Sequence, residues 1–458
     1  MVTYDTVIKE VCKREIENDL YEIKINDIDI YNYLKRYIRN KYLSLNGLEE
    51  NAQLPVQSRV TQIKSIAISL YQILKILLCR KHYDNCVHSF RRVEKIFGFY
   101  VDKFTDPIID NSSISENCII VEVGKNGKHL TPRRHENRII YADFFNFFAL
   151  IASMCISLIY EIRHKSTFNR LFKTLDKAFP DILYSRREIV RTVCYGLFKG
   201  LVYSKFYKRI HCKRLIAPSR ADFHAMIPAA RINKMRVIEL QHGITYSESL
   251  TYSGHQSLMF TPDIFLTFGE MNPKNVYGIE EDKIHNVGFA FLDYIENNLA
   301  LEKNRDSGVL FISEPSVTKP MISIALKFAK KHPHITFSFR PHPMEQLTQE
   351  QLSLLSSTKN VVLDDNTQNI LVSLAKYRYV VGENSTALYE ALSFGCLVGK
   401  LAMNGLSPRY LEESDKNFFF EINNEDDFIK FLEYNIEANS VKHIYSPYSR
   451  DAFEKLIM

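Results

Sequence analysis

The sequence predicts an α/β protein with two Rossmann-like domains facing a cleft and a largely helical N-terminal region. From about residue 213 onward, short apolar runs alternate with segments of helical periodicity. This alternation is typical of parallel strands joined by covering helices. A polar stretch at 297–308 (NNLALEKNRDSG) divides it into two series. Two such series in one chain predict two domains, with a hinge between them at this polar stretch.

Length and composition are those of a globular protein with more than one domain. The chain has 458 residues, of which 46% are hydrophobic and 24% are charged, and its net charge is +6. This composition excludes extended disorder, and the modest charge argues against a nucleic-acid binder. The 8 cysteines have no paired spacing, and the first residues lack the apolar core of a signal peptide. We therefore expect a protein of the reducing cytoplasm.

The first 200 residues are expected to be mainly helical. Residues 30–42 and 63–78 repeat apolar side chains at helical spacing, and a strand-like run follows at 118–123. An apolar segment at 144–160 (FFNFFALIASMCISLIY) has only the lower limit of length for a membrane span and contains polar residues. We interpret it as a buried core helix, with contact to the inner membrane surface as the alternative.

The two alternating series predict the remaining elements in order. The first series predicts strands at 213–218, 236–240, 263–268 and 284–287, and a helix at 222–232 that Pro228 breaks. The second predicts strands at 309–313, 335–340, 361–363, 379–382 and 397–401, and helices at 321–331, 368–376, 386–394 and 425–435. We assign 1–296 to an N-terminal domain, helical to about 200 and Rossmann-like beyond, and 305–458 to a C-terminal Rossmann-like domain.

Three loops at the ends of predicted strands carry residues suited to chemistry, since ligands of open α/β sheets gather at the carboxyl ends of strands. The first is Gln241-His242-Gly243, after the strand at 236–240. Glycine permits a sharp turn that exposes the imidazole, which could take a proton from a hydroxyl near neutral pH. A histidine that only bonds the loop backbone explains these residues equally well.

The second loop, Arg340-Pro341-His342-Pro343, follows the strand at 335–340. Two prolines stiffen it, and Arg340 and His342 can both donate to phosphate oxygens. The simpler alternative is a stiff connection with an incidental histidine. We favour anion binding, because rigid loops that carry donors suit it.

The third loop, 382–386 (GENST), lies between a strand and a helix. Ser385 or Thr386 would cap the helix and leave backbone N–H groups that attract a phosphate. Glu383 could accept a hydrogen bond from a ribose or sugar hydroxyl. For the two hydroxyl residues alone, ordinary capping is a strong alternative.

Metal and cofactor motifs carry little weight. Cys79, His82, Cys86 and His88 are zinc-friendly side chains, but the first three fall on one helical stripe and cannot enclose a tetrahedral ion. Walker A, GxGxxG, HExxH and GxSxG motifs are missing from the sequence. We expect no metal site and no cofactor.

The three loops in this order, strand–QHG, RPHP and ENST followed by EALSFG, resemble bacterial GT-B glycosyltransferases of capsule and lipopolysaccharide synthesis. They are similar to HP-motif transferases that use CMP-activated sugars and to CDP-glycerol glycerophosphotransferases. The resemblance covers about residues 213–400. It implies that His242 corresponds to the histidine that acts as the catalytic base in the glycerophosphotransferases, although Gln241 stands where that family has Trp. The acidic motif of sialyltransferases is missing from this sequence. The donor-binding residues that it implies are Arg340, His342, Glu383, Ser385 and Thr386.

The resemblance implies metal-independent, inverting transfer of a sugar from a nucleotide donor, CMP-sugars favoured, to a surface polysaccharide or lipid-linked glycan. The acceptor would lie in the N-terminal domain beside Gln241, Asp222 and Glu248, with Glu239 and Asp222 as the next candidates for the base. The expected partners are a nucleotide sugar, a glycan or lipid-linked acceptor and the inner membrane surface, not nucleic acid. Open alternatives are a CDP-glycerol-type polyol-phosphate transferase, a UDP-sugar transferase or 2-epimerase, and a non-catalytic capsule-assembly module.

Overall fold

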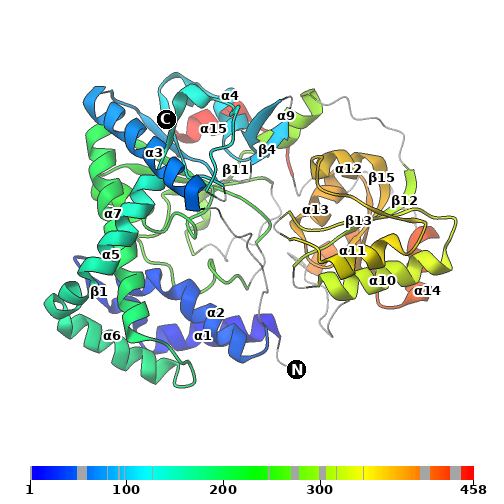
Figure 1. Ribbon diagram of the computed structural model, residues 1–458, viewed down its shortest axis with the longest axis horizontal. Helices are drawn as coiled ribbons and strands as arrows, with labels where there is room; N and C mark the ends of the chain where they lie inside the picture. Colours follow the sequence, from blue (N-terminus) through cyan, green and yellow to red (C-terminus); the bar gives the residue numbers. More distant parts are fainter. Residues whose placement is uncertain are drawn as a thin grey trace.

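The computed structural model contains two parallel β-sheets, each covered by helices and lying side by side (Figure 1). The predicted α/β class with two Rossmann-like sheets is confirmed. The residues that the structure describes are 3–48, 59–79, 81–90, 93–96, 98–125, 127–245, 248–269, 278–298, 306–315, 317–343, 345–402, 413–433 and 445–457. Most of the expected hinge at 297–308 lies outside them.

The N-terminal sheet has seven strands, all parallel, in the order β11-β10-β9-β8-β3-β6-β7. The strands are β3 (Asn85–His88), β6 (Cys118–Glu122), β7 (Ile139–Tyr141), β8 (Arg214–Ala217), β9 (Arg236–Leu240), β10 (Ile264–Thr267) and β11 (Ile284–Asn286). The expectation of a helical region up to about residue 200 needs correction, because β3, β6 and β7 precede that point. Only β6 was predicted, since β3 (NCVH) and β7 (IIY) are too short to show a pattern.

The N-terminal domain also contains helices and two small hairpins, and α1, α2 and α6 pack with α7 in a cluster separate from the sheet. The helices are α1 (Tyr4–Glu17), α2 (Lys35–Leu45), α3 (Arg59–Cys79), α4 (Asp106–Asp110), α5 (Asp143–Arg163), α6 (Lys165–Ala178), α7 (Arg186–Ile210), α8 (Met226–Ile232) and α9 (Ala290–Asn298). The hairpins are β1–β2 (Lys24–Ile25, Ile28–Asp29) and β4–β5 (Val93–Ile96, Phe99–Asp102). Pro228 does not break α8 as expected, because it lies in the first turn, where its missing N–H removes no helical hydrogen bond.

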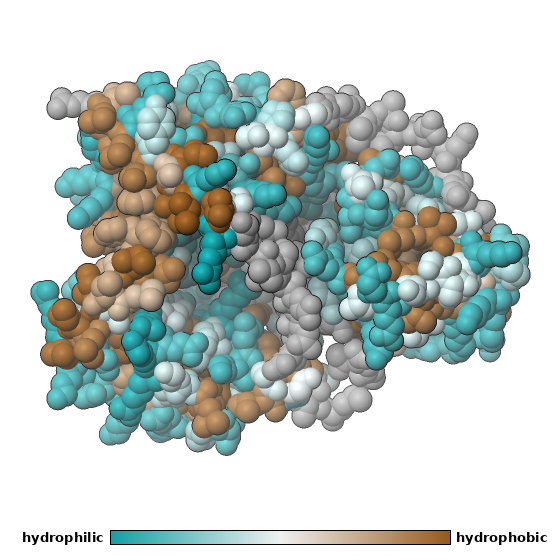
Figure 2. Space-filling model, in the orientation of Figure 1, coloured by the Kyte–Doolittle hydropathy of each residue, from teal (hydrophilic) through white to brown (hydrophobic). Residues whose placement is uncertain are grey.

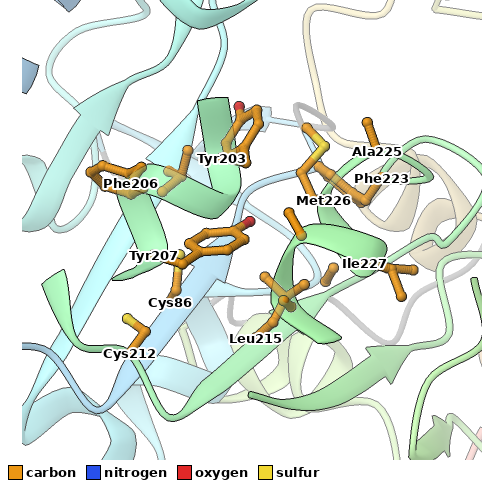
Figure 3. Close-up of a cluster of buried hydrophobic side chains, with 14 of the residues drawn as sticks. Cys86, Tyr203, Phe206, Tyr207, Cys212, Leu215, Phe223, Ala225, Met226 and Ile227 are labelled. Carbon is orange, nitrogen blue, oxygen red and sulfur yellow. The ribbon is translucent and has the colours of Figure 1, made fainter. Parts of the chain in front are cut away.

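The core of the N-terminal domain lies between the sheet, α7 and α8. Figure 3 shows Tyr203 and Tyr207 of α7 close to Phe223 and Met226, which lie at the start of α8. All four are buried against β3 and β8. This packing holds the carboxyl ends of the two central strands in place.

The segment at 144–160 is helical, but the expectation of a buried core helix is wrong. It forms most of α5, and only 22% of the apolar window of α5 is buried. By length and composition, α3 and α5 could each cross a membrane, and α3 is buried to a similarly small extent, 17%. The exposed apolar side chains of these two helices therefore do not contribute to the core of the fold, and they need another explanation.

The C-terminal sheet has six parallel strands in the order β14-β13-β12-β15-β16-β17. They are β12 (Asp306–Ile312), β13 (Phe337–Arg340), β14 (Val361–Leu363), β15 (Tyr377–Gly382), β16 (Leu397–Leu401) and β17 (Phe419–Ile422). Its helices are α10 (Thr318–Lys331), α11 (Gln349–Ser356), α12 (Ile370–Lys376), α13 (Thr386–Ser393) and α14 (Glu425–Glu433). Every strand and helix predicted for the second series is present, and α11 and β17 are additional.

Each sheet reverses its strand order once. The chain builds outward from β3 to β7, returns to place β8 beside β3, and continues outward to β11. In the C-terminal sheet, β15 returns beside β12 in the same way. In such sheets, ligands bind outside the carboxyl ends of strands at the reversal. The topology therefore marks one binding region between β3 and β8 and another between β12 and β15.

The two domains are joined more closely than the predicted boundary implies. Ile96 and Val101 of the β4–β5 hairpin belong to one apolar cluster with Leu371 and Leu374 of α12. The last helix, α15 (Arg450–Ile457), packs in the core of the N-terminal sheet beside β8 and β9. Residues 445–457 therefore return to the N-terminal sheet, which corrects the expectation that all of 305–458 forms the second domain.

Candidate functional site

His242 lies directly after β9, at the carboxyl end of the N-terminal sheet. It is half-buried, and the ring of Phe90 meets its imidazole edge-on at 4.9 Å between centroids. The hydroxyl of Tyr252 lies 3.4 Å from His242 Nδ1 and donates to Glu239 Oε1 at 2.6 Å. The imidazole is thus connected through a phenol to a buried carboxylate.

Glu239 is the buried end of this chain. Burial raises the pKa of its carboxyl, and the guanidinium of Arg220 partly offsets that effect. Arg220 Nε lies 2.8 Å from Glu239 Oε2, and the backbone N–H of Arg220 donates to Oε1 at 2.9 Å. The guanidinium also lies over the ring of Tyr252, 4.9 Å from its centroid. Arg220 therefore partly offsets the effect of burial on Glu239, and its guanidinium packs against the ring of Tyr252.

The N-terminal helices fix the loop that carries Tyr252. Arg39 of α2 is completely buried and pairs with Glu15 of α1 at 2.6 Å. The same guanidinium donates to the carbonyls of Leu250 at 2.7 Å and Ser253 at 3.0 Å, on either side of Tyr252. The N-terminal helices, in which the sequence showed no motif, thus hold the loop that carries Tyr252 in place.

Gln241 does not face a substrate as the acceptor-side expectation requires. It is 1% exposed, and its amide donates to the carbonyl of Gly243 at 3.0 Å and accepts from the N–H of Phe268 at 2.7 Å. These bonds tie the loop after β9 to the end of β10. Gln241 therefore positions His242 instead of binding the acceptor.

A small polar cavity lies at the strand reversal of the N-terminal sheet. Its volume of about 50 Å³ has room for a few water molecules. It is lined from the ends of β3 and β6, from α5, α7 and α8, and from the loop between β8 and α8, by residues that include Ser89, Phe90, Asn146, Lys199, Asp222 and Phe223. Phe90 also contacts His242, so the cavity and the imidazole share one wall.

The two remaining acceptor-side predictions differ in outcome. Asp222 lines this cavity, and its carboxylate accepts from the hydroxyl of Ser219 at 2.9 Å. Glu248 instead forms an ion pair with Lys9 of α1 at 3.2 Å. Asp222 therefore lies at the cavity and stays a prediction for the acceptor side, whereas Glu248 joins the loop after His242 to the N-terminal helix.

The third predicted loop forms the N-terminus of α13 at the reversal of the C-terminal sheet. Ser385 is the N-cap, and its hydroxyl accepts from the N–H of Ala387 at 3.3 Å. The N–H of Asn384 donates to Glu314, at the end of β12, at 2.8 Å. Glu383 is buried directly after β15. Capping of α13 and an anion-binding helix terminus are compatible here, because the cap uses one N–H of the first turn.

The structure corrects the prediction for Arg340. Its guanidinium is 5% exposed and donates twice to Asp364, at 2.9 and 2.8 Å. It also donates to the hydroxyl of Ser373 at 3.0 Å and to the carbonyl of Gln368 at 2.6 Å. These bonds join β13, β14 and α12, so Arg340 supports the loop instead of contacting a donor phosphate.

His342 lies in the loop that Arg340 supports and is half-buried. Its backbone N–H donates to Glu345 Oε2 at 3.2 Å, and the N–H of Glu345 donates back to the carbonyl of His342 at 2.8 Å. The two bonds form a tight turn. The turn fixes the backbone from which the imidazole of His342 extends.

The two strand-end regions meet across the domains. A β-carbon added to Gly243 would lie 3.6 Å from the hydroxyl oxygen of Thr386, the first residue of α13. Lys103 of the N-terminal domain pairs with Glu390 of α13 at 3.5 Å, and both side chains are nearly buried. The loop of His242 and the N-terminus of α13 therefore form one site. No set of three or more metal-ligating side chains is found in the described part of the chain.

Comparisons with known proteins give no family. No family model and no curated protein matches the chain. Among solved structures, the chain is similar to a UDP-GlcNAc 2-epimerase from Neisseria meningitidis, at 14% identity over 81% of this chain and 98% of that one, with a TM-score of 0.47. A glycosyltransferase from Rickettsia africae aligns at 15% identity over 82% and 93%, with a TM-score of 0.39.

The wall teichoic acid polymerase TagF aligns at 8% identity over 81% of this chain and 80% of that one, with a TM-score of 0.37. Because all three scores lie below 0.5, we infer function from the residues of this chain alone.

Proposed function

We propose that this protein is a glycosyltransferase of GT-B architecture that moves a sugar from a nucleotide donor to a glycan or lipid-linked acceptor. The observation that carries the proposal is the meeting of His242, a base candidate, with the N-terminus of α13, an anion-binding candidate. A transferase needs both at one place, because the acceptor loses a proton while the donor phosphate gains charge.

The donor would bind at the strand reversal of the C-terminal sheet. Backbone N–H groups at the start of α13 and the hydroxyls of Ser385 and Thr386 suit the nucleotide phosphates. His342, in the neighbouring loop, would donate a further hydrogen bond to a phosphate. Buried Glu383 would accept a hydrogen bond from a ribose or sugar hydroxyl. CMP-activated sugars are the favoured donors, because the loop with His342 and Pro343 resembles that of HP-motif transferases.

The hydrogen bonds of Tyr252 support an assignment of the basic ring nitrogen of His242. Tyr252 has one proton and donates it to Glu239, so a bond between Tyr252 and His242 requires the Nδ1–H of His242 to donate. Nε2 is then the unprotonated nitrogen that can accept a proton from a substrate hydroxyl. Glu239 and Tyr252 act as positioning residues, because they set this tautomer without touching the substrate.

Transfer would be a direct displacement. The acceptor hydroxyl passes its proton to His242 Nε2 while its oxygen attacks the anomeric carbon. The bond from that carbon to the phosphate oxygen breaks, and the electron pair leaves on the phosphate, where the N-terminus of α13 stabilises it. Attack opposite the leaving group inverts the anomeric configuration. The step as written uses no metal ion.

A thermal-shift screen against CMP, CDP, UDP, GDP and ADP tests the donor site. We expect stabilisation by CMP and its loss in Ser385→Ala. The matched control is Thr348→Ala, which removes the N-cap of α11 in the same domain. Each cap loss costs about 1 kcal/mol of stability, so only the nucleotide response separates the two variants.

The other outcomes separate the alternatives. A response to UDP, with conversion of the nucleotide sugar in the absence of acceptor, would identify a 2-epimerase. Release of CMP from a CDP-polyol would identify a polyol-phosphate transferase. A chain that responds to none of the five nucleotides would contradict the proposal and favour a non-catalytic assembly module.

A further inference from the structure

The strongest feature outside the site is an apolar surface on α3 and α5. We call it the outer apolar face. On α3 its large side chains are Val60, Ile63, Ile68, Tyr71, Leu74 and Leu78, and on α5 they are Phe147, Phe148, Leu150, Ile151, Met154, Ile156, Leu158, Ile159 and Ile162. Their exposed fractions range from 41% to 80%. In Figure 2, brown side chains gather over the part of the molecule where Figure 1 draws α3, α5 and α7.

The two helices have the opposite arrangement to a helix of a water-soluble protein. The residues that α5 buries include Ala149, Ala152, Ser153 and Ser157, whereas its large apolar residues point outward. A helix that faces water buries its large apolar side chains and exposes polar ones. An apolar face of this extent on a soluble protein marks an interaction surface.

Hydrogen bonds attach α3 to the folded domain, so the helices lie on its surface. The hydroxyl of Ser65 donates to the carbonyl of Gly127 at 2.7 Å, and that of Ser69 donates to the carbonyl of Tyr141 at 2.5 Å. Ser69 also accepts from the N–H of Phe144, at the start of α5. A helix tied in this way to strand β7 cannot leave the domain to cross a bilayer without breaking these bonds.

The fully exposed charges of α3 and α5 are all basic. They are Arg59, Lys64 and Lys75 on α3 and Arg163 on α5. The two acidic residues of these helices, Asp143 and Glu161, are half-buried. A second copy of the chain would bring the same cations to a symmetric interface, without acidic partners for them. An anionic surface complements them.

We propose that the outer apolar face binds the surface of an anionic lipid bilayer, with α3 and α5 parallel to the membrane plane. The apolar side chains enter the boundary between headgroups and acyl chains, and the basic side chains pair with lipid phosphates. This inference does not depend on the transferase function. Asn146 of α5 lines the polar cavity beside His242, so the membrane-bound helix also forms a wall of the proposed acceptor site.

Vesicle co-sedimentation tests the proposal. We expect the full chain to sediment with phosphatidylcholine vesicles that contain phosphatidylglycerol, and more weakly with phosphatidylcholine alone. The double variant Leu158→Glu/Ile162→Glu should lower binding by about 100-fold or more, because two large apolar contacts are lost. Both positions are 67% exposed, so its melting temperature should match that of the wild type. The control variant is Ile232→Glu, which changes an exposed apolar residue on α8. This variant should bind vesicles like the wild type.

A second variant tests the electrostatic part and does not change the apolar side chains. Lys64→Gln/Lys75→Gln should weaken binding to anionic vesicles by about 5-fold per lysine and leave binding to neutral vesicles unchanged. This lysine variant still tests the proposal if Leu158→Glu/Ile162→Glu has a lower melting temperature than the wild type. Failure of the wild type to bind either vesicle would overturn the proposal.

So would equal binding by both variants and the wild type. A lipid-free dimer that Leu158→Glu dissociates, without vesicle binding, would assign the face to a second copy instead.

Discussion

The two sheets reverse their strand order in the same way, yet they place different chemistry at the carboxyl ends of their strands. The N-terminal sheet places an imidazole beside a phenol and a buried carboxylate, with Glu239 and His242 at the end of β9. The C-terminal sheet places a helix N-terminus there, with Ser385 as its cap. Under the proposed function, proton transfer and charge binding are therefore divided between the two domains. Variants of the first should change turnover, and variants of the second should change donor affinity or stability.

The largest expected effect is that of His242→Ala. Loss of the proposed base should lower kcat by about 10²–10⁴ and leave the donor Kd nearly unchanged, because the donor binds in the other domain. Steady-state kinetics and calorimetric titration of the nucleotide measure the two quantities. A near-normal kcat would contradict this division of roles. Asp222, which lines the cavity, would then be the next candidate for the base.

Arg340→Met tests the corrected role of the second loop. Removal of the guanidinium leaves Asp364 without its pair in a nearly buried site, which should lower the free energy of unfolding by about 3 kcal/mol. Donor affinity of the remaining folded protein should change little. Urea unfolding and nucleotide titration measure the two effects. A large loss of affinity at unchanged stability would show that Arg340 does contact the donor.

Acid should destabilise the N-terminal domain. Burial lowers the pKa of His88 to about 3 and that of His224 to about 4. Because the unfolded state binds protons near pH 6.5 and the folded state does not, stability is complete above pH 6.5 and falls as the pH drops toward these values. Urea unfolding from pH 7 to pH 4.5 should show up to about 1.4 kcal/mol per pH unit for each histidine.

His224→Asn should remove about half of that histidine contribution. An unchanged slope in this variant would show that His224 is protonated equally in both states.

Tyr252→Phe should have the smallest effect. It removes the hydroxyl between Glu239 and His242 but leaves the imidazole in place, so kcat should fall by about 10-fold and the pH dependence of kcat should shift. The control is Tyr37→Phe, which removes another hydroxyl bonded to a carboxylate, that of Glu188, on the far side of α2. A loss of kcat without any pH shift would assign Tyr252 a purely structural role.

Periodicity predicted most of the C-terminal domain, because most of its strands are short, largely apolar segments between clear helical ones. It missed β3 because NCVH contains two polar residues in four. The site was predicted in part. Strand-end position identified His242 and Ser385, but Arg220 and Tyr252 lie in loops, and only tertiary structure brings them to Glu239.

Two errors have identifiable physical causes. Arg340 precedes the HP motif, and its pairing with Asp364 depends on a neighbouring strand that motif spacing does not reveal. For α5, mean hydropathy does not distinguish a buried helix from one whose apolar face points outward. The spacing of Ala149, Ala152, Ser153 and Ser157 along one stripe does carry that information, since small residues mark the side that packs closely.

The return of α15 to the N-terminal sheet orders events during synthesis. Phe453 and Ile457 are buried in the same core as Ile216 of β8 and Ile238 of β9. The ribosome therefore releases every strand of the N-terminal sheet well before the residues that close its core. The C-terminal sheet is synthesised in between and can complete its own packing first. The core of the N-terminal sheet is therefore complete only after the C-terminal sheet has been synthesised.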